Sequence, residues 1–232
     1  MNAAGDFIVA WNHTFVGSDD IVLGRHFAGP PQPSDCAPIP LGGCKKPTLE
    51  FKGRLALKEK SPDKGDSLVW KWVKGDAVST GDLGDPLATD AYTFCLYDGG
   101  GSLVSEGTIE PGGLCGTATP KPCWKALGTP AGAKGYKYVD KEANADGAQK
   151  LILKPGDAGQ SKAIVKAKGE ALDAPALPLV LPATVQLQAT NGTCWSAEFT
   201  TAGVLTNTSS VFAGKASIPA GSPSGAFVAP AP

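Results

Sequence analysis

Short stretches in which apolar and polar residues alternate, separated by turn-forming residues, constrain the fold of this chain most. No window of twelve residues free of Gly and Pro has the 3.6-residue apolar period of an amphipathic helix. The 30 glycines and 20 prolines among 232 residues also interrupt the chain too often for long helices. We therefore predict an all-β fold with strands over Phe7–Trp11, Ile21–Phe27, Leu49–Leu57, Leu68–Lys74, Ala91–Tyr97, Leu103–Ile109, Tyr136–Asp140, Lys150–Lys154, Ala163–Lys168, Thr184–Thr190, Thr193–Phe199 and Val211–Ala213.

Two hairpins have clear turn signals. Asn191-Gly192 lies between two alternating runs, and this pair is preferred in two-residue loops whose residues both need a positive φ. Such a loop places Ala189 opposite Cys194, so that Cys194 points into the core. The second hairpin turns at Asp98–Ser102, which is rich in glycine.

A gapped internal repeat organises the middle of the chain. Residues 55–58, 71–76 and 123–126 match, in the same order, residues 151–154, 166–170 and 194–197. The repeat predicts two related halves, 49–141 and 150–216. We expect them to form one antiparallel β-sandwich, immunoglobulin-like in its general architecture.

The ends differ from the middle in composition. Residues 1–29 contain a strand pair, and residues 30–48 are rich in proline and read as a linker stapled by a disulfide. Residues 217–232 consist mostly of Ala, Gly, Pro and Ser and predict a flexible tail.

Cysteine usage indicates an oxidising compartment. Six cysteines form an even set without CxxC pairs, which favours disulfides over zinc: Cys36, Cys44, Cys95, Cys115, Cys123 and Cys194. Proximity favours Cys36–Cys44. The other four allow three connectivities; we prefer Cys115–Cys123 with Cys95–Cys194, and the rival, Cys95–Cys115 with Cys123–Cys194, follows from the repeat.

The sequence predicts an extracellular or cell-surface location. Residues 1–20 contain no apolar core long enough for a signal peptide, so we expect the export signal to have been removed. No apolar run approaches the roughly 20 residues needed to cross a bilayer, so we expect no membrane insertion. A net charge of −1 argues against a general nucleic-acid binder.

The N-terminal segment resembles a repeat of bacterial surface proteins. Asp6-Phe7-Ile8-Val9-Ala10-Trp11, followed by Val22-Leu23-Gly24-Arg25-His26-Phe27, is similar to one unit of the "DFVVVW…GVFGRRF" repeats of large secreted and cell-surface proteins. The later Cys-Trp pairs, Cys123-Trp124 and Cys194-Trp195, look like a module of uncharacterised exported bacterial proteins. This resemblance implies a location and a β fold but no activity.

Two groups of residues are candidate binding sites. Trp70 and Trp72 share one face of a strand, with Lys74, so they either stack on sugar rings or fill the core. Oxygen-bearing residues at alternate positions imitate the start of a calcium loop without its closing acid, and otherwise form an ordinary turn: Asp140, Glu142, Asn144 and Asp146. No other cofactor is expected.

Charge is segregated along the chain. Residues 45–74 have a balance of +5 and residues 76–120 a balance of −7. The lysines either solvate a strand face or bind the acidic region of another copy.

No catalytic motif is present, since GxSxG and HExxH are both missing. We therefore expect a non-enzymatic exported structural or interaction module that assembles with itself or with other surface proteins into a filament or layer. The alternative is a carbohydrate-binding module that uses Trp70 and Trp72.

Overall fold

A computed structural model describes residues 7–13, 21–27 and 34–217, and the chain divides into two units, Met1–Ser34 and Asp35–Pro232. The first unit contains the antiparallel pair β1 (Phe7–His13) and β2 (Ile21–Phe27). This confirms the predicted N-terminal strand pair. The predicted tail lies outside the described residues except for Ser217.

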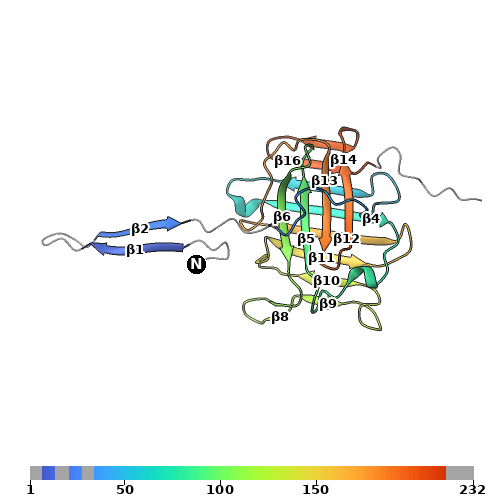
Figure 1. Ribbon diagram of the computed structural model, residues 1–232, viewed down its shortest axis with the longest axis horizontal. Helices are drawn as coiled ribbons and strands as arrows, with labels where there is room; N and C mark the ends of the chain where they lie inside the picture. The colour runs from blue at the N-terminus through green and yellow to red at the C-terminus, as the bar shows by residue number, and fades with distance from the viewer. Residues whose placement is uncertain (1–6, 14–20, 28–33, 218–232) are drawn as a thin grey trace, which may run out of the picture. The chain divides into compact units, whose positions relative to one another are not determined.

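The second unit contains two antiparallel sheets that face each other (Figure 1). The larger has eight strands in the order β15 (Val204–Asn207), β16 (Val211–Lys215), β3 (Gly53–Lys58), β4 (Ser67–Gly75), β12 (Ser161–Lys168), β11 (Ala148–Lys154), β10 (Tyr136–Val139) and β9 (Trp124–Ala126). The smaller has four: β14 (Cys194–Phe199), β13 (Ala183–Ala189), β5 (Tyr92–Tyr97) and β6 (Leu103–Ile109). Short elements complete it: β7 (Leu114–Cys115), β8 (Lys121–Pro122) and the 3₁₀ turns η1 (Asp63–Gly65), η2 (Gly81–Leu83) and η3 (Thr201–Gly203).

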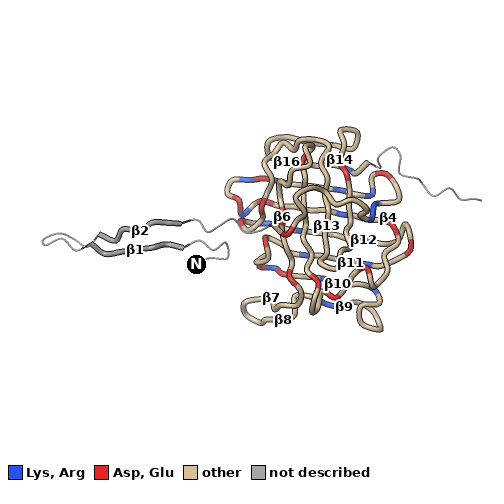
Figure 2. Tube along the Cα trace, in the orientation of Figure 1, with Lys and Arg blue, Asp and Glu red and all other residues tan. Residues whose placement is uncertain are grey.

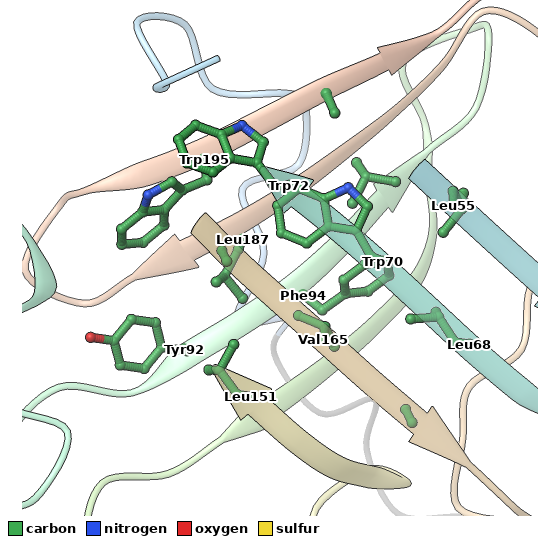
Figure 3. Packing of buried hydrophobic residues seen from close by; sticks show 14 of the residues in the cluster. Leu55, Leu68, Trp70, Trp72, Tyr92, Phe94, Leu151, Val165, Leu187 and Trp195 are labelled. Atoms are coloured by element: carbon green, nitrogen blue, oxygen red, sulfur yellow. The ribbon is translucent and has the colours of Figure 1, made fainter. Parts of the chain in front are cut away.

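The predicted all-β antiparallel sandwich is confirmed. In Figure 1 the strands of the smaller sheet run across those of the larger one, one of the two ways in which sheets pack face to face. Aromatic side chains fill the space between them (Figure 3): Trp70 meets Phe94 edge-on with ring centroids 6.3 Å apart. Trp72 Nε1 donates a hydrogen bond to the carbonyl of Ser196 across the two layers (3.2 Å).

The internal repeat is not confirmed. Its first two motifs do fall in comparable hairpins, β3–β4 and β11–β12, which lie side by side through the β4–β12 pairing. The third motif does not: Trp124 is in edge strand β9 of the larger sheet, whereas Trp195 is in β14 of the smaller one. The proposed halves also interleave, because β13 pairs with β5 and β16 with β3.

The hairpin at Asn191-Gly192 forms, but its loop is one residue longer than predicted. Gln188, not Ala189, pairs with Cys194, and Gly192 has a φ of 87°. A three-residue loop with glycine in the left-handed region suits this register. Because a one-residue slip moves each side chain to the opposite face, Trp195 enters the core and Cys194 points away from it.

The segment from residue 35 to residue 48 is not a linker. It forms a strap over the outer face of the four-stranded sheet and bridges to β14, where the Lys45 amide donates to the Cys194 carbonyl (2.9 Å) and the Ser196 amide to the Lys45 carbonyl (2.8 Å). Further along, the Thr48 amide donates to the carbonyl of Lys74 at the end of β4 (2.8 Å). The strap therefore belongs to the sandwich and contacts both sheets.

The disulfides are Cys36–Cys95, Cys44–Cys194 and Cys115–Cys123. The predicted Cys115–Cys123 is confirmed, whereas Cys36–Cys44 and Cys95–Cys194 are wrong, as is the rival pairing. Cys95 and Cys194 lie on strands separated by β13, about 9–10 Å apart, beyond the reach of a disulfide. Each bonds instead to the strap above it.

Candidate functional site

Trp70 and Trp72 form part of the core. Both side chains have 0% exposure, so neither indole is accessible to a glycan, and their proposed sugar-binding role is wrong. Lys74, expected on their face, is exposed in the left-handed conformation (φ 56°), next to the point where the β4–β12 register shifts. A bulge of this kind re-aims the residue that it carries.

The calcium-like segment is a turn stabilised by its own acids. The Asp140 carboxylate accepts hydrogen bonds from the amides of Glu142 (3.0 Å) and Asn144 (2.8 Å). The Asp146 carboxylate accepts from the amide of Thr108 (2.8 Å). Among the described residues no group of three or more His, Cys, Asp or Glu side chains is placed to hold a metal. The structure thus brings Asp140, Glu142 and Asn144 into one turn but not into a cation site.

Asp146 has a different role, which the sequence did not predict. It and Asp173 accept hydrogen bonds from the Thr108 and Glu106 amides of edge strand β6 (2.8 and 3.2 Å). Amides at a sheet edge are otherwise ready to pair with another chain. The two aspartates therefore block this edge.

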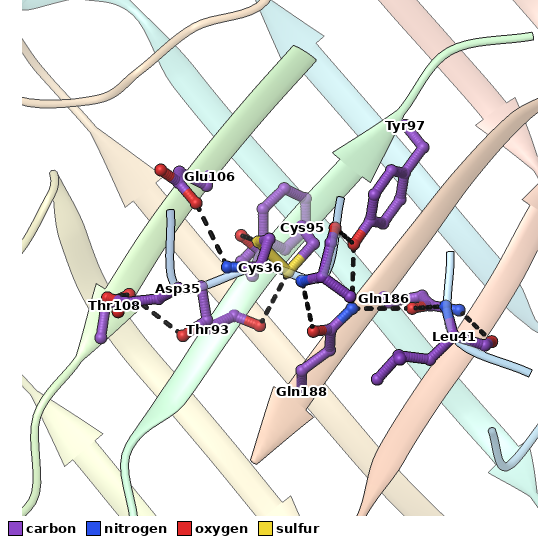
Figure 4. Close-up of a disulfide and its surroundings, with 12 residues drawn as sticks. Asp35, Cys36, Leu41, Thr93, Cys95, Tyr97, Glu106, Thr108, Gln186 and Gln188 are labelled. Atoms are coloured by element: carbon purple, nitrogen blue, oxygen red, sulfur yellow. Dashed lines mark hydrogen bonds between the residues drawn. A yellow bond between two sulfur atoms is a disulfide. The ribbon is translucent and has the colours of Figure 1, made fainter. Parts of the chain in front are cut away.

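The outer face of the four-stranded sheet is closed by the strap through an uncharged polar network (Figure 4). Gln186 accepts from the amide of Leu41 (3.0 Å) and donates to its carbonyl (2.8 Å). Gln188 accepts from the Ala37 amide (3.1 Å) and donates to Tyr97 Oη (3.0 Å), which in turn donates to the Ala37 carbonyl (2.7 Å). Gln186 and Gln188 are 1% and 9% exposed, so the network is buried and leaves no room for a ligand.

Three disulfides among the described residues are consistent with an extracellular protein. None of the described helical segments is long and apolar enough to span a bilayer. The interior holds a narrow apolar cavity of about 20 Å³ beside Phe94 and Leu187, which has room for about one water molecule. This cavity is therefore too small for a ligand larger than water.

The outer face of the eight-stranded sheet has the opposite character. None of its strands contains Asp or Glu, and eleven basic residues occupy its outward positions. We call this surface the cationic face; its basic members are Arg54, Lys58, Lys71, Lys125, Lys137, Lys150, Lys154, Lys162, Lys166, Lys168 and Lys215. In Figure 2 the acidic segments lie mainly in loops, while basic segments lie along these strands.

The strand register arranges these residues in rows across the sheet. One row crosses seven strands at paired positions: Lys215, Arg54, Lys71, Ile164, Ile152, Lys137 and Lys125. At its centre Ile152 and Ile164, both half-buried, lie directly opposite each other. Six cations occupy the neighbouring positions around this isoleucine pair and form what we call the lysine ring: Lys71, Lys137, Lys150, Lys154, Lys162 and Lys166.

None of these cations forms an ion pair with an acid of the described residues. Lys45 and Asp82 form the one ion pair between residues that the structure describes (3.2 Å), and neither belongs to the cationic face. Within the lysine ring, Lys150 lies directly opposite Lys166, and Lys154 opposite Lys162. Like charges at directly opposed positions destabilise a sheet, so this arrangement has a cost in folding free energy.

The acidic residues are instead engaged in turns. Hydrogen bonding from the Asp85 amide lowers the pKa of Asp90. Burial acts to raise the pKa of Asp82, but hydrogen bonds from Ser79 and Lys45 outweigh it and lower that pKa. Asp98 accepts from the amides of Gly100 and Ser102 (both 2.9 Å). These three aspartates thus stabilise turns outside the strands, whereas Glu106 lies in β6.

The sequence contained part of the signal for the cationic face. The basic residues of 54–58, 150–154 and 162–168 fall only on alternate positions, which predicts a solvated strand face, and the structure places all three segments in one sheet. Missing from the sequence was the register, which aligns the lysines into rows.

No family model, no curated protein and no solved structure matches the chain.

Proposed function

We propose that this chain is an exported, non-enzymatic interaction module whose working surface is the cationic face. One observation carries the proposal: eleven basic residues lie on the outer face of one sheet whose strands contain no acidic residue, in a protein with a net charge of −1. A single-signed surface raises the local concentration of an oppositely charged partner and speeds its association. The N-terminal resemblance to bacterial surface repeats supports a place at the cell envelope.

The like-charge pairs add to this argument. Ordinary exposed sheets intersperse both signs of charge, whereas this one keeps lysines opposite lysines. A cost of this kind is expected where the charge serves binding. The four-stranded sheet, buried under its strap, offers no comparable surface.

Assembly of copies through this face has weaker support. A second copy would need an acidic surface of matching extent, and the five aspartates of residues 76–120 are each hydrogen-bonded to backbone amides outside the strands. The described arrangement therefore favours a foreign anionic partner over a second copy. Light scattering over a concentration series would detect self-association, which high salt should weaken if the contact is ionic.

Retention on sulfonate beads at pH 7 tests the working surface. A chain with a net charge of −1 is not expected to bind them unless its cations lie together. The face triple, Lys71→Gln with Lys150→Gln and Lys166→Gln, should elute at clearly lower salt than the native chain. The loop triple, Lys60→Gln with Lys64→Gln and Lys141→Gln, changes the net charge equally at exposed positions outside the strands and should elute close to the native chain. Equal elution of the two triples would overturn the proposal.

A further inference from the structure

We infer that the cationic face binds a linear anionic polysaccharide, laid across the strands with its sugar rings over Ile152 and Ile164. This inference rests on the proposed function and names the partner. It depends on three properties of the surface: the direction in which its cations are aligned, the spacing between these cations, and the apolar centre that they surround.

The charge runs in a direction that suits an extended chain. The row from Lys215 to Lys125 crosses seven strands, a track of about 29 Å at about 4.8 Å per strand. Five of its seven positions are basic. The turns at both strand ends mix the two signs, with Glu59, Lys60 and Asp63 at one end and Lys74, Asp76 and Asp157 at the other. Only a path across the strands is therefore free of acidic residues.

The spacing suits anionic groups that are several ångströms apart. Neighbouring cations in a row are about 4.8 Å apart, and those two residues apart along a strand are about 6.7 Å apart. An acidic polysaccharide carries one charge per sugar or per few sugars, so its anions recur on the length scale of a sugar ring. Lysine side chains are flexible and can follow such a repeat, since each presents its charge on a four-carbon stem.

The apolar centre distinguishes a sugar polymer from a bare polyanion. Ile152 and Ile164 are half-buried between the six cations of the lysine ring. The C–H faces of sugar rings can pack on such a surface while carboxylates or sulfates reach the surrounding ammonium groups. A polyphosphate has no apolar face to place there.

Two other polyanions suit this surface less well. The outward positions of the cationic face contain no Phe, Tyr or Trp, and the exposed ring beside it is Phe51, 6.0 Å from Lys215 Nζ at one end of the row, so bases of single-stranded nucleic acid have no run of rings to stack on. Adsorption to a bilayer is usually completed by Trp, Phe or Leu entering the interface. The apolar side chains between the lysines here are Val, Ile and Ala, and the one exposed leucine of the sheet, Leu205, lies in its edge strand β15, away from the lysine ring.

The test uses the purified, oxidised full chain and calorimetric titration with polygalacturonate at two salt concentrations. Binding should weaken with salt, and the face triple should lower the affinity on the order of tenfold or more, because three charge contacts are lost. The loop triple should change the affinity by less than about threefold. The substitution Ile164→Ser should lower the affinity for polygalacturonate several-fold and leave binding of polyphosphate unchanged.

Four comparison probes separate failure of this inference from failure of the proposed function: neutral dextran, polyphosphate, single-stranded DNA and phosphatidylglycerol vesicles. Dextran should not bind. Tighter binding of polyphosphate, DNA or vesicles than of polygalacturonate, with sensitivity to the face triple, would overturn the polysaccharide and keep the proposed function. Absence of any binding that depends on the face triple would overturn both.

Discussion

The outer faces of the two sheets have opposite chemistry. The strands of the four-stranded sheet contain no Lys or Arg, and their outer face is covered by the strap, two disulfides and the buried amides of Gln186 and Gln188. The strands of the eight-stranded sheet contain no Asp or Glu. Their lysines, which the strap does not cover, are exposed or half-buried. The comparison teaches that one face is closed by packing within the chain, whereas the other carries its charges in solvent.

The chemistry of each face follows from the hydrogen-bond partners and the solvent that are available to its side chains. Beneath the strap a charge would have to be desolvated, so neutral amides, which can both donate and accept, bond the strap backbone instead. The exposed lysines remain hydrated, so their mutual repulsion costs little per pair. Changes to the strap-covered outer face of the four-stranded sheet, which we call the closed face, should therefore have large effects on stability. Changes to the cationic face should have small ones.

The largest effect is expected from removing a strap disulfide. The bond Cys44–Cys194 joins residues separated by 150 positions, and Cys115–Cys123 joins residues separated by 8. On the chain-entropy account, Cys44→Ala with Cys194→Ala should lower the free energy of unfolding by up to about 5 kcal/mol, and Cys115→Ala with Cys123→Ala by about 2–3 kcal/mol. Guanidinium unfolding without reductant measures both.

The two pairs can be compared because three of their four cysteines are similarly buried: Cys44 is 7% exposed, Cys194 8% and Cys123 8%, whereas Cys115 is half-buried. Cavity effects of the substitutions should thus differ at Cys115 alone, where the cavity left by alanine is smaller. An equal loss for the two pairs, or a smaller loss for the strap pair, would mean that the strap contributes little to the closed face.

The register of one hairpin explains why the strap could not be predicted. Asn191-Gly192 correctly identified a turn, and the strands on either side were correct in type. One additional loop residue moved Cys194 to the outer face, where it meets Cys44. Turn chemistry predicts that a chain reverses better than it predicts loop length, and an error of one residue changes every face assignment. The pairing of Cys36 with Cys95 depended on the same long-range packing.

A smaller loss of stability is expected from the Gln186→Leu substitution. It leaves the amide and the carbonyl of Leu41 without their side-chain partner beneath the strap, which should cost about 1–3 kcal/mol. The hydrogen-exchange rate of the Leu41 amide should increase, and denaturant unfolding should show the loss of stability.

Gln149→Leu is the control for that substitution. Gln149 donates to the Lys141 carbonyl at an exposed position (3.3 Å), so its loss should change stability by less than about 0.5 kcal/mol. Equal effects of the two substitutions, with no change in Leu41 exchange, would contradict a structural role for the buried amides.

The candidate sites were predicted less well than the fold. The spacing of Trp70 and Trp72 correctly placed both on one face of a strand, but that face is the core, since large aromatic residues fill a sandwich first. The acidic residues at 140–146 were correctly placed in a turn, whose amides occupy the carboxylate oxygens. Lysine alternation was visible along single strands. The gathering of the lysines on one surface depends on which strands become neighbours, and the tertiary pairing of the strands decides that.

The smallest change in stability, and the one opposite in sign, is expected on the cationic face. Lys166 lies directly opposite Lys150, so Lys166→Glu replaces a repulsive pair with an attractive one. Stability should rise by about 0.2–1 kcal/mol, because cross-strand charge pairs contribute on that scale. At 1 M salt, where the screening length is about 3 Å, most of the gain should disappear.

Lys168→Glu is the matched change, since Lys168 lies opposite Ser67 and has no basic residue paired with it across β11. Its effect on stability should be smaller than that of Lys166→Glu, although both alter the net charge equally. If Lys166→Glu stabilises the fold while weakening retention on sulfonate beads, stability and binding oppose each other at one residue, as expected of a face kept for contact. If it destabilises the fold as much as Lys168→Glu or more, the lysines of this sheet are not in conflict, and their cost could no longer be used as an argument for function.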